Sequence, residues 1–288
     1  MGFAFHRPGT IDAAIGFARE HGDAARFIAG GTDLIIQINR GRTGPRHLIS
    51  LAGLGLDSIV ETPTEYVIGA TATHDAVVRF PGFHDGLIAL PQASAVVGGR
   101  QVRNIATVGG NIVNASPAAD LVPVLLALDA TVELRGSTGS RALPLDRFLV
   151  DRGRTERKPD EILTAVRFDK PPAASATSFL KAGRRKAMEI SVICVAAFLS
   201  RSSRGDGYDM ARIAIGAAAS RTVRVPKAEA RATAGGSDAF VEAARLAAEQ
   251  ATPISDVRSS ADYRKLLVAA LVERALNHCA NAIGKAGG

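Results

Sequence analysis

The sequence contains no tryptophan, and only 3 tyrosines accompany its 11 phenylalanines. Proteins that bind single-stranded nucleic acids stack bases on aromatic side chains placed among basic residues. The chain has no stripe of that kind, so its formal net charge of +7 does not predict a nucleic-acid partner. Because arginines are spread over the whole chain, the charge indicates a mixed, solvated surface. An excess of positive charge also favours the binding of anionic ligands or acidic partner surfaces.

Cysteine is equally scarce, with Cys194 and Cys279 as the only two. Both stand in apolar segments, which predicts buried free thiols. An iron–sulfur cluster normally needs four cysteines, so the chain is not expected to hold one alone, and a disulfide framework is excluded. No apolar run has the length of a signal-peptide core or of a membrane span. These absences predict a cytoplasmic chain with no membrane span.

The usual catalytic signatures are also missing. No G-x-G-x-x-G follows a predicted strand, and the chain has no P-loop, no H-E-x-x-H and no G-x-S-x-G. The six histidines show no metal-ligand spacing; they are His6, His21, His47, His74, His84 and His278. His74 with Asp75 is interpreted as a helix start, and the pair Asp160–Glu161 as solvated surface. No general base is predicted next to the motifs described below.

The chain has 288 residues, of which 47% are hydrophobic and 22% charged. This is ordinary globular composition, and the length suffices for two or three domains. A first unit, residues 1–55, reads as β-α-β-α-β, with strands at 3–5, 26–29 and 47–50 and helices at 11–21 and 34–39. Thr10 is predicted to cap the first helix and Gly22 to end it. The unit is smaller than a typical independent domain.

A second unit covers residues 56–176 and a third covers 177–288. The second is predicted to contain a strand at 66–70, helices at 73–79, 81–94 and 119–128, and a hairpin of strands 131–135 and 141–145. Its segment 98–119 is small and polar, which predicts a functional loop region. Residues 171–175 look like a linker. The third unit is predicted to have strands at 179–181, 191–201 and 210–218, then helices at 238–250 and 261–283. The fold class is therefore α+β.

A double glycine stands between a predicted strand and a predicted helix. Glycine lets the backbone approach a ligand closely and adopt positive φ, and successive exposed N–H groups at such a turn bind anions. The alternative is a tight turn in which Thr32 or Asp33 caps the helix. Asp33 opposes phosphate binding unless its carboxylate turns away. The motif is Ala29-Gly30-Gly31-Thr32-Asp33-Leu34.

The second unit repeats this small-Gly-Gly-polar chemistry in Thr107-Val108-Gly109-Gly110-Asn111. Two such loops in separate units suggest a pyrophosphate held between them, and two unrelated turns are the alternative. Asp120 stands at the start of the predicted helix 119–128. Its carboxylate can cap the helix dipole or accept a hydrogen bond from a ribose hydroxyl, and both roles can coexist.

In their order and spacing, these motifs resemble the FAD-binding medium subunit of the molybdenum hydroxylases. That group includes the medium subunit of carbon monoxide dehydrogenase and the flavin segment of xanthine dehydrogenase. The resemblance covers nearly the whole chain. It is carried by residues 29–34, 101–112, 115–121, 125–130, 160–163 and 179–181, the last leading into Arg184-Arg185.

The resemblance implies a two-part FAD-binding domain of the p-cresol methylhydroxylase type, followed by an α+β C-terminal domain of the carbon monoxide dehydrogenase flavoprotein type. It implies that both glycine loops hold the FAD diphosphate through the backbone of residues 30–33 and 107–111. Asp120 would bind the adenosine side, and Leu163 and Lys181 would lie near the isoalloxazine ring. The implied cofactor-binding residues are Ala29, Gly30, Gly31, Thr32, Asp33, Leu34, Thr107, Gly109, Gly110, Asn111, Asp120, Leu163 and Lys181.

The resemblance also implies an oxidoreductase subunit that works in electron transfer. Electrons from a molybdenum cofactor in a large partner subunit would pass through two [2Fe–2S] clusters in a small partner subunit to FAD, and then to a terminal acceptor. The chain would be the medium subunit of a heterotrimer, usually paired as a dimer of heterotrimers. FAD needs binding, orientation and electrostatics from its protein, which agrees with the missing acid–base signatures. The alternatives are a stand-alone FAD-dependent oxidoreductase of the same fold and a non-catalytic scaffold.

Overall fold

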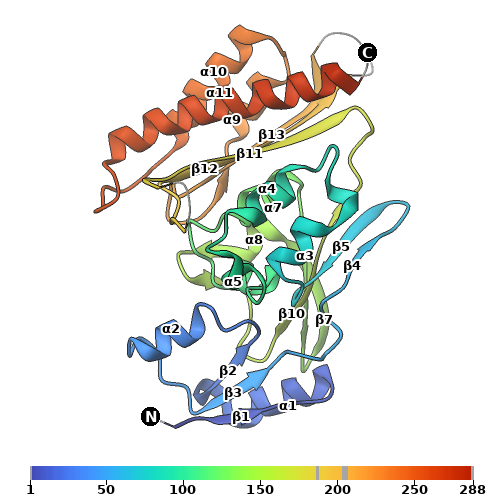
Figure 1. Ribbon diagram of the computed structural model, residues 1–288, viewed down its shortest axis with the longest axis vertical. Helices are drawn as coiled ribbons and strands as arrows, with labels where there is room; N and C mark the ends of the chain where they lie inside the picture. The colour runs from blue at the N-terminus through green and yellow to red at the C-terminus, as the bar shows by residue number, and fades with distance from the viewer. Residues whose placement is uncertain (1, 186–187, 203–206, 287–288) are drawn as a thin grey trace.

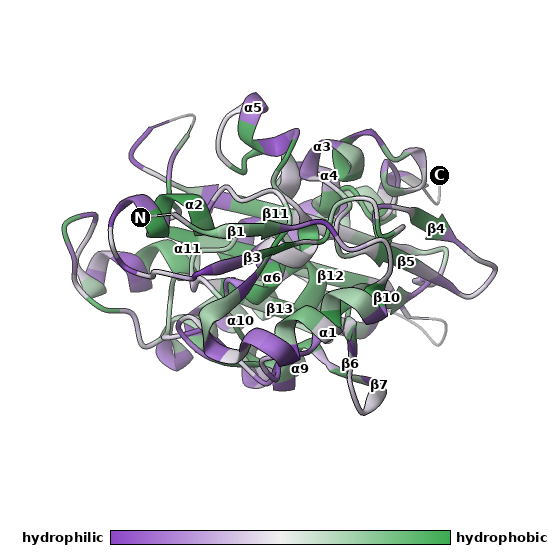
Figure 2. Ribbon diagram, turned by 90° about the horizontal axis from the view of Figure 1, so that it is seen from below, coloured by the Kyte–Doolittle hydropathy of each residue, from purple (hydrophilic) through white to green (hydrophobic). Residues whose placement is uncertain are grey.

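The structure, a computed structural model, describes residues 2–185, 188–202 and 207–286. Three units follow one another along its long axis, with the N-terminal unit at one end and the C-terminal unit at the other (Figure 1). Figure 2 shows hydrophobic residues gathered on the inner strands β12 and β13, while polar residues mark peripheral segments such as α9. Within the ranges described, no helix combines the length and the apolar character needed to cross a membrane.

The N-terminal unit is a three-stranded parallel sheet with one covering helix. Its elements are β1 (Ala4–His6), α1 (Ile11–His21), β2 (Ala25–Ile28), α2 (Leu34–Asn39) and β3 (His47–Ser50), with strand order β1-β3-β2. The Thr10 hydroxyl accepts a hydrogen bond from the Ala13 amide at 3.1 Å, and Gly22 ends α1 with a φ of 49°. Both predicted ends of α1 are therefore confirmed. Because the small core includes Leu56 and Ile162, the unit is completed by the chain that follows it.

The middle unit is built on a five-stranded antiparallel sheet of order β4-β5-β10-β6-β7. The strands are β4 (Ile59–Glu61), β5 (Glu65–Gly69), β6 (Thr131–Gly136), β7 (Gly139–Pro144) and β10 (Ile162–Asp169). The predicted hairpin is confirmed, with Gly136 opposite Gly139 at its tip. The central strand β10 was not predicted, because it is buried on both faces and so lacks the alternation that marks a strand with one solvated face.

Helices of the middle unit connect these strands. They are α3 (His74–Arg79), α4 (Ala89–Ala95), α5 (Arg100–Arg103), α6 (Val108–Val113), α7 (Leu121–Ala127) and α8 (Leu145–Phe148). A 3₁₀ turn spans Pro81–Phe83. Two short strands, β8 (Leu149–Asp151) and β9 (Arg154–Thr155), pair with each other. The single helix predicted at 81–94 is wrong, because the 3₁₀ turn and α4 divide that segment. The loop predicted at 98–119 is also wrong, since it contains α5 and α6. Burial of Val108 and Ile112 stabilises α6 although glycine disfavours helices.

The C-terminal unit is a four-stranded antiparallel sheet with helices on its outer face (Figure 1). Its elements are β11 (Ser175–Ala182), β12 (Ile193–Arg201), β13 (Tyr208–Gly216), β14 (Val223–Arg224), α9 (Pro226–Ala232), α10 (Ser237–Gln250) and α11 (Ala261–Ala286). The inner face packs on α4 and α7 of the middle unit. Strand β11 begins at Ser175, inside the predicted linker, and α9 was not predicted. Cys194 and Cys279 are fully buried free thiols, as predicted.

Candidate functional site

A cavity of about 750 Å³ lies between the N-terminal and middle units. Its walls come from residues 26–34, from the neighbourhood of α6 and from the start of β10. Binding cavities for small molecules and cofactors range from about 300 to 1,000 Å³, so this one has the size of a ligand site. The predicted residues that line it are Ala29, Gly30, Gly31, Thr32, Asp33, Leu34, Thr107, Gly109, Gly110, Asn111 and Leu163.

The first glycine loop brings unpaired main-chain donors to this cavity. Strand β2 ends at Ile28, and α2 begins at Leu34 after a turn in which Gly31 has a φ of 70°. Within the described part of the chain, the five N–H groups of residues 30–34 donate no hydrogen bond. Successive main-chain amides of this kind form a concave anion site. The loop can therefore hold a phosphate group without any basic side chain.

Two of the motif glycines are required by contacts inside the protein. A Cβ atom on Gly30 would lie 1.8 Å from the carbonyl oxygen of Ile105, and a Cβ atom on Gly109 would lie 2.7 Å from the Cβ atom of Ala70. Packing within the fold therefore requires glycine at both positions, and their close approach to a ligand stays a prediction. Gly30 is where the first loop touches the segment that leads to the second loop.

The second glycine loop differs from the first because its amides are already engaged. The Val108 and Gly109 N–H groups donate to the carbonyl oxygens of Ala72 and Ala70 at 2.9 and 2.8 Å. The Gly110 amide donates to Thr107 Oγ1 at 3.1 Å, and the Asn111 amide to the Thr107 carbonyl oxygen at 3.0 Å. Within the predicted range 107–111, four amides are therefore engaged inside the protein, and only the Thr107 amide donates no hydrogen bond among the described residues. This loop can contribute through its side chains.

Asn111 is the side chain of the second loop that most clearly requires a partner. Its Oδ1 atom is buried and has no hydrogen-bond partner among the described residues, and the residue lines the cavity. A buried acceptor without a donor costs about 1–3 kcal/mol. A bound ligand with an N–H or O–H group at this wall would satisfy it. Nearby, Gln37 of α2 donates to Asn114 at 3.5 Å, which links the two units beside the cavity.

The charges around the first loop are mixed. Asp33 occupies the N-cap position of α2, as one predicted alternative had it, but its side chain makes no capping hydrogen bond. Burial raises the pKa of its carboxyl group. Arg26 and Arg157 line the same cavity and favour an anionic ligand. Arg157 is held by the carbonyl oxygens of Lys158, Pro159 and Glu161 at 2.9, 3.2 and 2.7 Å. Neither arginine stood out in the sequence, because arginine occurs throughout the chain.

Asp120 and Lys181 form a buried ion pair that does not line the cavity. Lys181 Nζ donates to Asp120 Oδ2 at 2.6 Å and to the Glu189 carbonyl oxygen at 2.8 Å, and the Ser191 hydroxyl lies 2.5 Å from Asp120 Oδ1. Burial raises the pKa of Asp120, although Lys181 and Ser191 oppose the shift. Asp120 stands at the N-cap position of α7, as predicted, but its side chain makes no capping hydrogen bond. The pair instead fixes the segment that carries Ile190, which does line the cavity.

Leu163 of β10 and Glu161, the residue just before this strand, lie at the cavity wall. Leu163 is buried at an irregularity in the pairing of β10 with β6. Glu161 accepts two hydrogen bonds from Arg141, at 2.7 and 2.9 Å, and one from the Lys158 amide at 2.7 Å. Burial opposes its ionisation, but these hydrogen bonds hold the pKa of Glu161 below its usual value. The interpretation of Glu161 as solvated surface is therefore wrong.

His74 begins α3, as predicted, and is buried at the cavity wall. Its Nδ1 atom lies 3.4 Å from the Ser94 hydroxyl oxygen. Burial lowers the pKa of His74 to about 4, and the charge of Arg103 adds to this shift. The imidazole is therefore neutral at physiological pH.

This pKa predicts a pH dependence of stability. The unfolded chain binds a proton at His74 below about pH 6.5, whereas the folded chain does so only below about 4. The stabilising contribution is complete above pH 6.5 and is lost as the pH falls towards 4. Compared with His74→Gln, the wild-type chain should lose about 2 kcal/mol of its unfolding free energy between pH 8 and pH 5. Urea titrations of both proteins measure this difference, and a constant difference would contradict the assignment.

Two family models together match most of the chain. The FAD binding domain in molybdopterin dehydrogenase matches residues 1–171, and the CO dehydrogenase flavoprotein C-terminal domain matches residues 178–279. The nicotinate dehydrogenase FAD-subunit of Eubacterium barkeri is 37% identical over 196 residues, which is 66% of each chain. The putative xanthine dehydrogenase FAD-binding subunit of Escherichia coli is 30% identical over 98% of this chain and 97% of its own length.

A solved structure of carbon monoxide dehydrogenase from Hydrogenophaga pseudoflava contains a chain with the same fold. Its TM-score is 0.94 at 27% identity, and the match covers 98% of both chains. The fold and the site thus define a two-part FAD-binding domain followed by a C-terminal domain of mixed helix and sheet. The chain belongs to the family of FAD-binding subunits of the molybdenum hydroxylases, and it is an oxidoreductase subunit. The family resemblance and the fold class inferred from the sequence are confirmed.

Proposed function

We propose that this chain is the medium subunit of a heterotrimeric molybdenum hydroxylase. It holds FAD and passes electrons from [2Fe–2S] clusters of a small partner subunit to a terminal acceptor, while a large partner subunit with the molybdenum cofactor oxidises the substrate. The complex is a dimer of heterotrimers in the cytoplasm. The observation that best supports the proposal is the set of five unpaired amides at residues 30–34 on the wall of a 750 Å³ cavity.

The donors and acceptors of the cavity fit FAD. The amides of residues 30–34 donate to the oxygens of its diphosphate, and Arg26 and Arg157 add positive charge on the same wall. The unpaired Asn111 Oδ1 atom accepts a hydrogen bond from the cofactor. Bound FAD supplies the ability to exchange single electrons with a cluster and electron pairs with an acceptor. The protein binds and orients the cofactor, and apolar groups such as Leu163 and Ile190 exclude water from it.

Asp120 and Lys181 influence the cofactor site indirectly, by fixing the chain segment that forms part of its wall. Their ion pair and the Lys181 bond to the Glu189 carbonyl oxygen hold the segment of Ile190 against the cavity. Neither residue lines the cavity. The Lys181 ammonium group already donates to Asp120 and to the carbonyl oxygens of Glu189 and Val96, which uses its three N–H groups. We therefore propose that both residues position the cofactor site.

Asn111→Ala provides a test of the cavity. The substitution removes an acceptor that has no partner in the chain, so we expect the free energy of unfolding of the FAD-free chain to stay equal or to rise. We expect the dissociation constant for FAD to increase about tenfold, equivalent to one lost hydrogen bond. Fluorescence titration with FAD and urea denaturation measure the two quantities. Asn277→Ala on α11, outside the cavity, is the matched control, and an unchanged FAD affinity in Asn111→Ala would contradict the placement.

The assembly is tested by producing the chain together with the products of its neighbouring reading frames. We expect a small cysteine-rich chain and a large chain to co-purify with it, and one FAD per copy of this chain. On addition of the complex's substrate, the flavin absorbance should bleach only when all three chains are present. Bleaching with this chain alone would support the stand-alone oxidoreductase instead. A folded chain that takes up no flavin would contradict both functions.

A further inference from the structure

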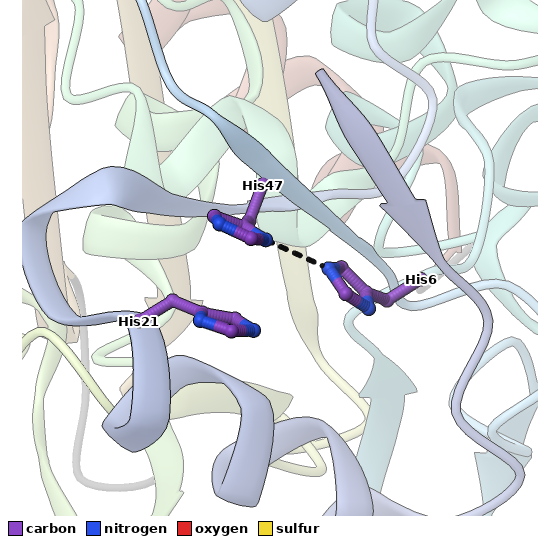
Figure 3. Close-up of side chains that lie close together, drawn as sticks. All are labelled: His6, His21 and His47. Atoms are coloured by element: carbon purple, nitrogen blue, oxygen red, sulfur yellow. Dashed lines mark hydrogen bonds between the residues drawn. The ribbon is translucent and has the colours of Figure 1, made fainter.

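Three histidines that are far apart in the sequence meet on the N-terminal unit. His6 ends β1, His21 ends α1 and His47 begins β3, and their rings lie together at one edge of the parallel sheet (Figure 3). His6 Nε2 lies 3.0 Å from His47 Nδ1. The ring of His21 stacks on that of His47 with centroids 3.7 Å apart, and His6 and His21 are 5.4 Å apart. One nitrogen from each ring lies within 4.8 Å of the other two.

The fold fixes this arrangement. Pairing of β1 with β3 places Ala4 opposite His47 and His6 opposite Ile49, so the two imidazoles lie one pleat apart on neighbouring strands. The apolar face of α1 packs on the same sheet and brings its last residue, His21, to this edge. The Phe17 ring contacts His6 at 4.5 Å between centroids. The spacing of the histidines along the sequence gave no indication of this cluster, because strand pairing and the packing of α1 bring the three rings together.

Imidazole nitrogens are ligands for zinc, copper and nickel ions when they are unprotonated. Two nitrogens bound to one tetrahedral zinc ion at about 2.0–2.1 Å would be about 3.4 Å apart. The observed 3.0 Å between His6 and His47 is close to that value.

We propose that His6, His21 and His47 form a binding site for a divalent first-row transition-metal ion, with zinc as its expected occupant. The fourth position is open to water or to the carboxylate of Glu20, whose Oε1 atom lies 3.9 Å from His21 Nε2. None of the three histidines lines the FAD cavity, so the site is separate from the cofactor. The bound ion would tie α1 to the sheet whose strand β2 leads into the first glycine loop.

The test uses the untagged, FAD-loaded, full-length protein after treatment with a chelator. Isothermal titration with zinc is expected to give one ion per chain with a micromolar or tighter dissociation constant. The variants His21→Gln and His47→Gln should each weaken binding at least tenfold. His84→Gln is the matched control, because His84 is exposed and its ring bonds only to the Val78 carbonyl oxygen among the described residues. Binding in that variant should equal that of the wild type.

A second measurement needs no variant. Cobalt added to the wild-type protein should produce the visible absorption of a four- or five-coordinate site, and X-ray absorption should show imidazole nitrogens bound to the metal. If a variant does not fold, the spectrum of the wild-type protein still shows whether the histidines bind the metal ion. Absence of stoichiometric zinc binding, or binding that neither histidine variant weakens, would overturn the proposal. Flavin content is recorded in parallel, so a failure of the zinc site stays distinguishable from a failure of FAD binding.

Discussion

Replacing Lys181 by methionine is expected to lower the free energy of unfolding by about 3–5 kcal/mol, the cost of leaving one charge of a buried ion pair without its partner. The Asp120 side chain is 8% exposed and that of Lys181 12% exposed. Methionine has a similar length to lysine, so the substitution leaves only a small cavity. The decrease in the free energy of unfolding is therefore due mainly to the unpaired Asp120 carboxylate. Urea denaturation of the FAD-free chain measures the effect.

The double variant Asp120→Asn/Lys181→Met serves as the control for this interpretation. It removes both charges, so most of the lost stability should return, and the coupling between the two single substitutions should be large. The pair also fixes the segment of Ile190 at the cavity, and we expect weaker FAD binding in the single variant. If Lys181→Met kept full stability but altered the flavin spectrum, Lys181 would act on the isoalloxazine ring directly.

The second large effect is expected for Gly110→Val, which should abolish FAD retention while the chain stays folded. The Gly110 position lines the cavity, and the nearest atom to an added Cβ is Thr107 Oγ1 at 2.9 Å. A branched side chain there would occupy cofactor space and displace the threonine hydroxyl. Valine is a better helix former than glycine, so the substitution carries no loss from helix propensity. The flavin-to-protein ratio should fall from near one to near zero.

Gly16→Val is the matched control for this substitution. Gly16 lies on the exposed side of α1, and nothing is within 4 Å of an added Cβ atom. It should retain FAD at the wild-type ratio, and circular dichroism should show both variants folded. Full flavin content in a folded Gly110→Val protein would place the cofactor away from α6.

Local signals in the sequence were sufficient to predict several helices and strands. The ends of α1 follow from a hydroxyl cap at Thr10 and a glycine at position 22, both of which act within one turn. The hairpin of β6 and β7 follows from the glycines at its tip. Strand β10 could not be predicted in this way, because its burial depends on strands from two other parts of the chain.

The cavity was located by its motifs, but the roles of their residues required the structure. The two glycine loops look alike in sequence, yet the amides of residues 30–34 are unpaired and those of residues 108–111 are engaged. The Val108 and Gly109 amides are engaged by Ala72 and Ala70, which lie far away in the sequence, and the next two amides bond to Thr107. The meeting of His6, His21 and His47 is likewise a product of strand pairing, and spacing alone gave no sign of it.

The most direct test of the cofactor site is a crystal structure of the chain with bound FAD. We expect the diphosphate oxygens to lie about 2.7–3.2 Å from main-chain nitrogens of residues 30–34, with a cofactor donor at Asn111 Oδ1. If the diphosphate lay elsewhere while these amides kept no partner, the first glycine loop would not be the phosphate site, and the account of how this subunit holds its flavin would be contradicted.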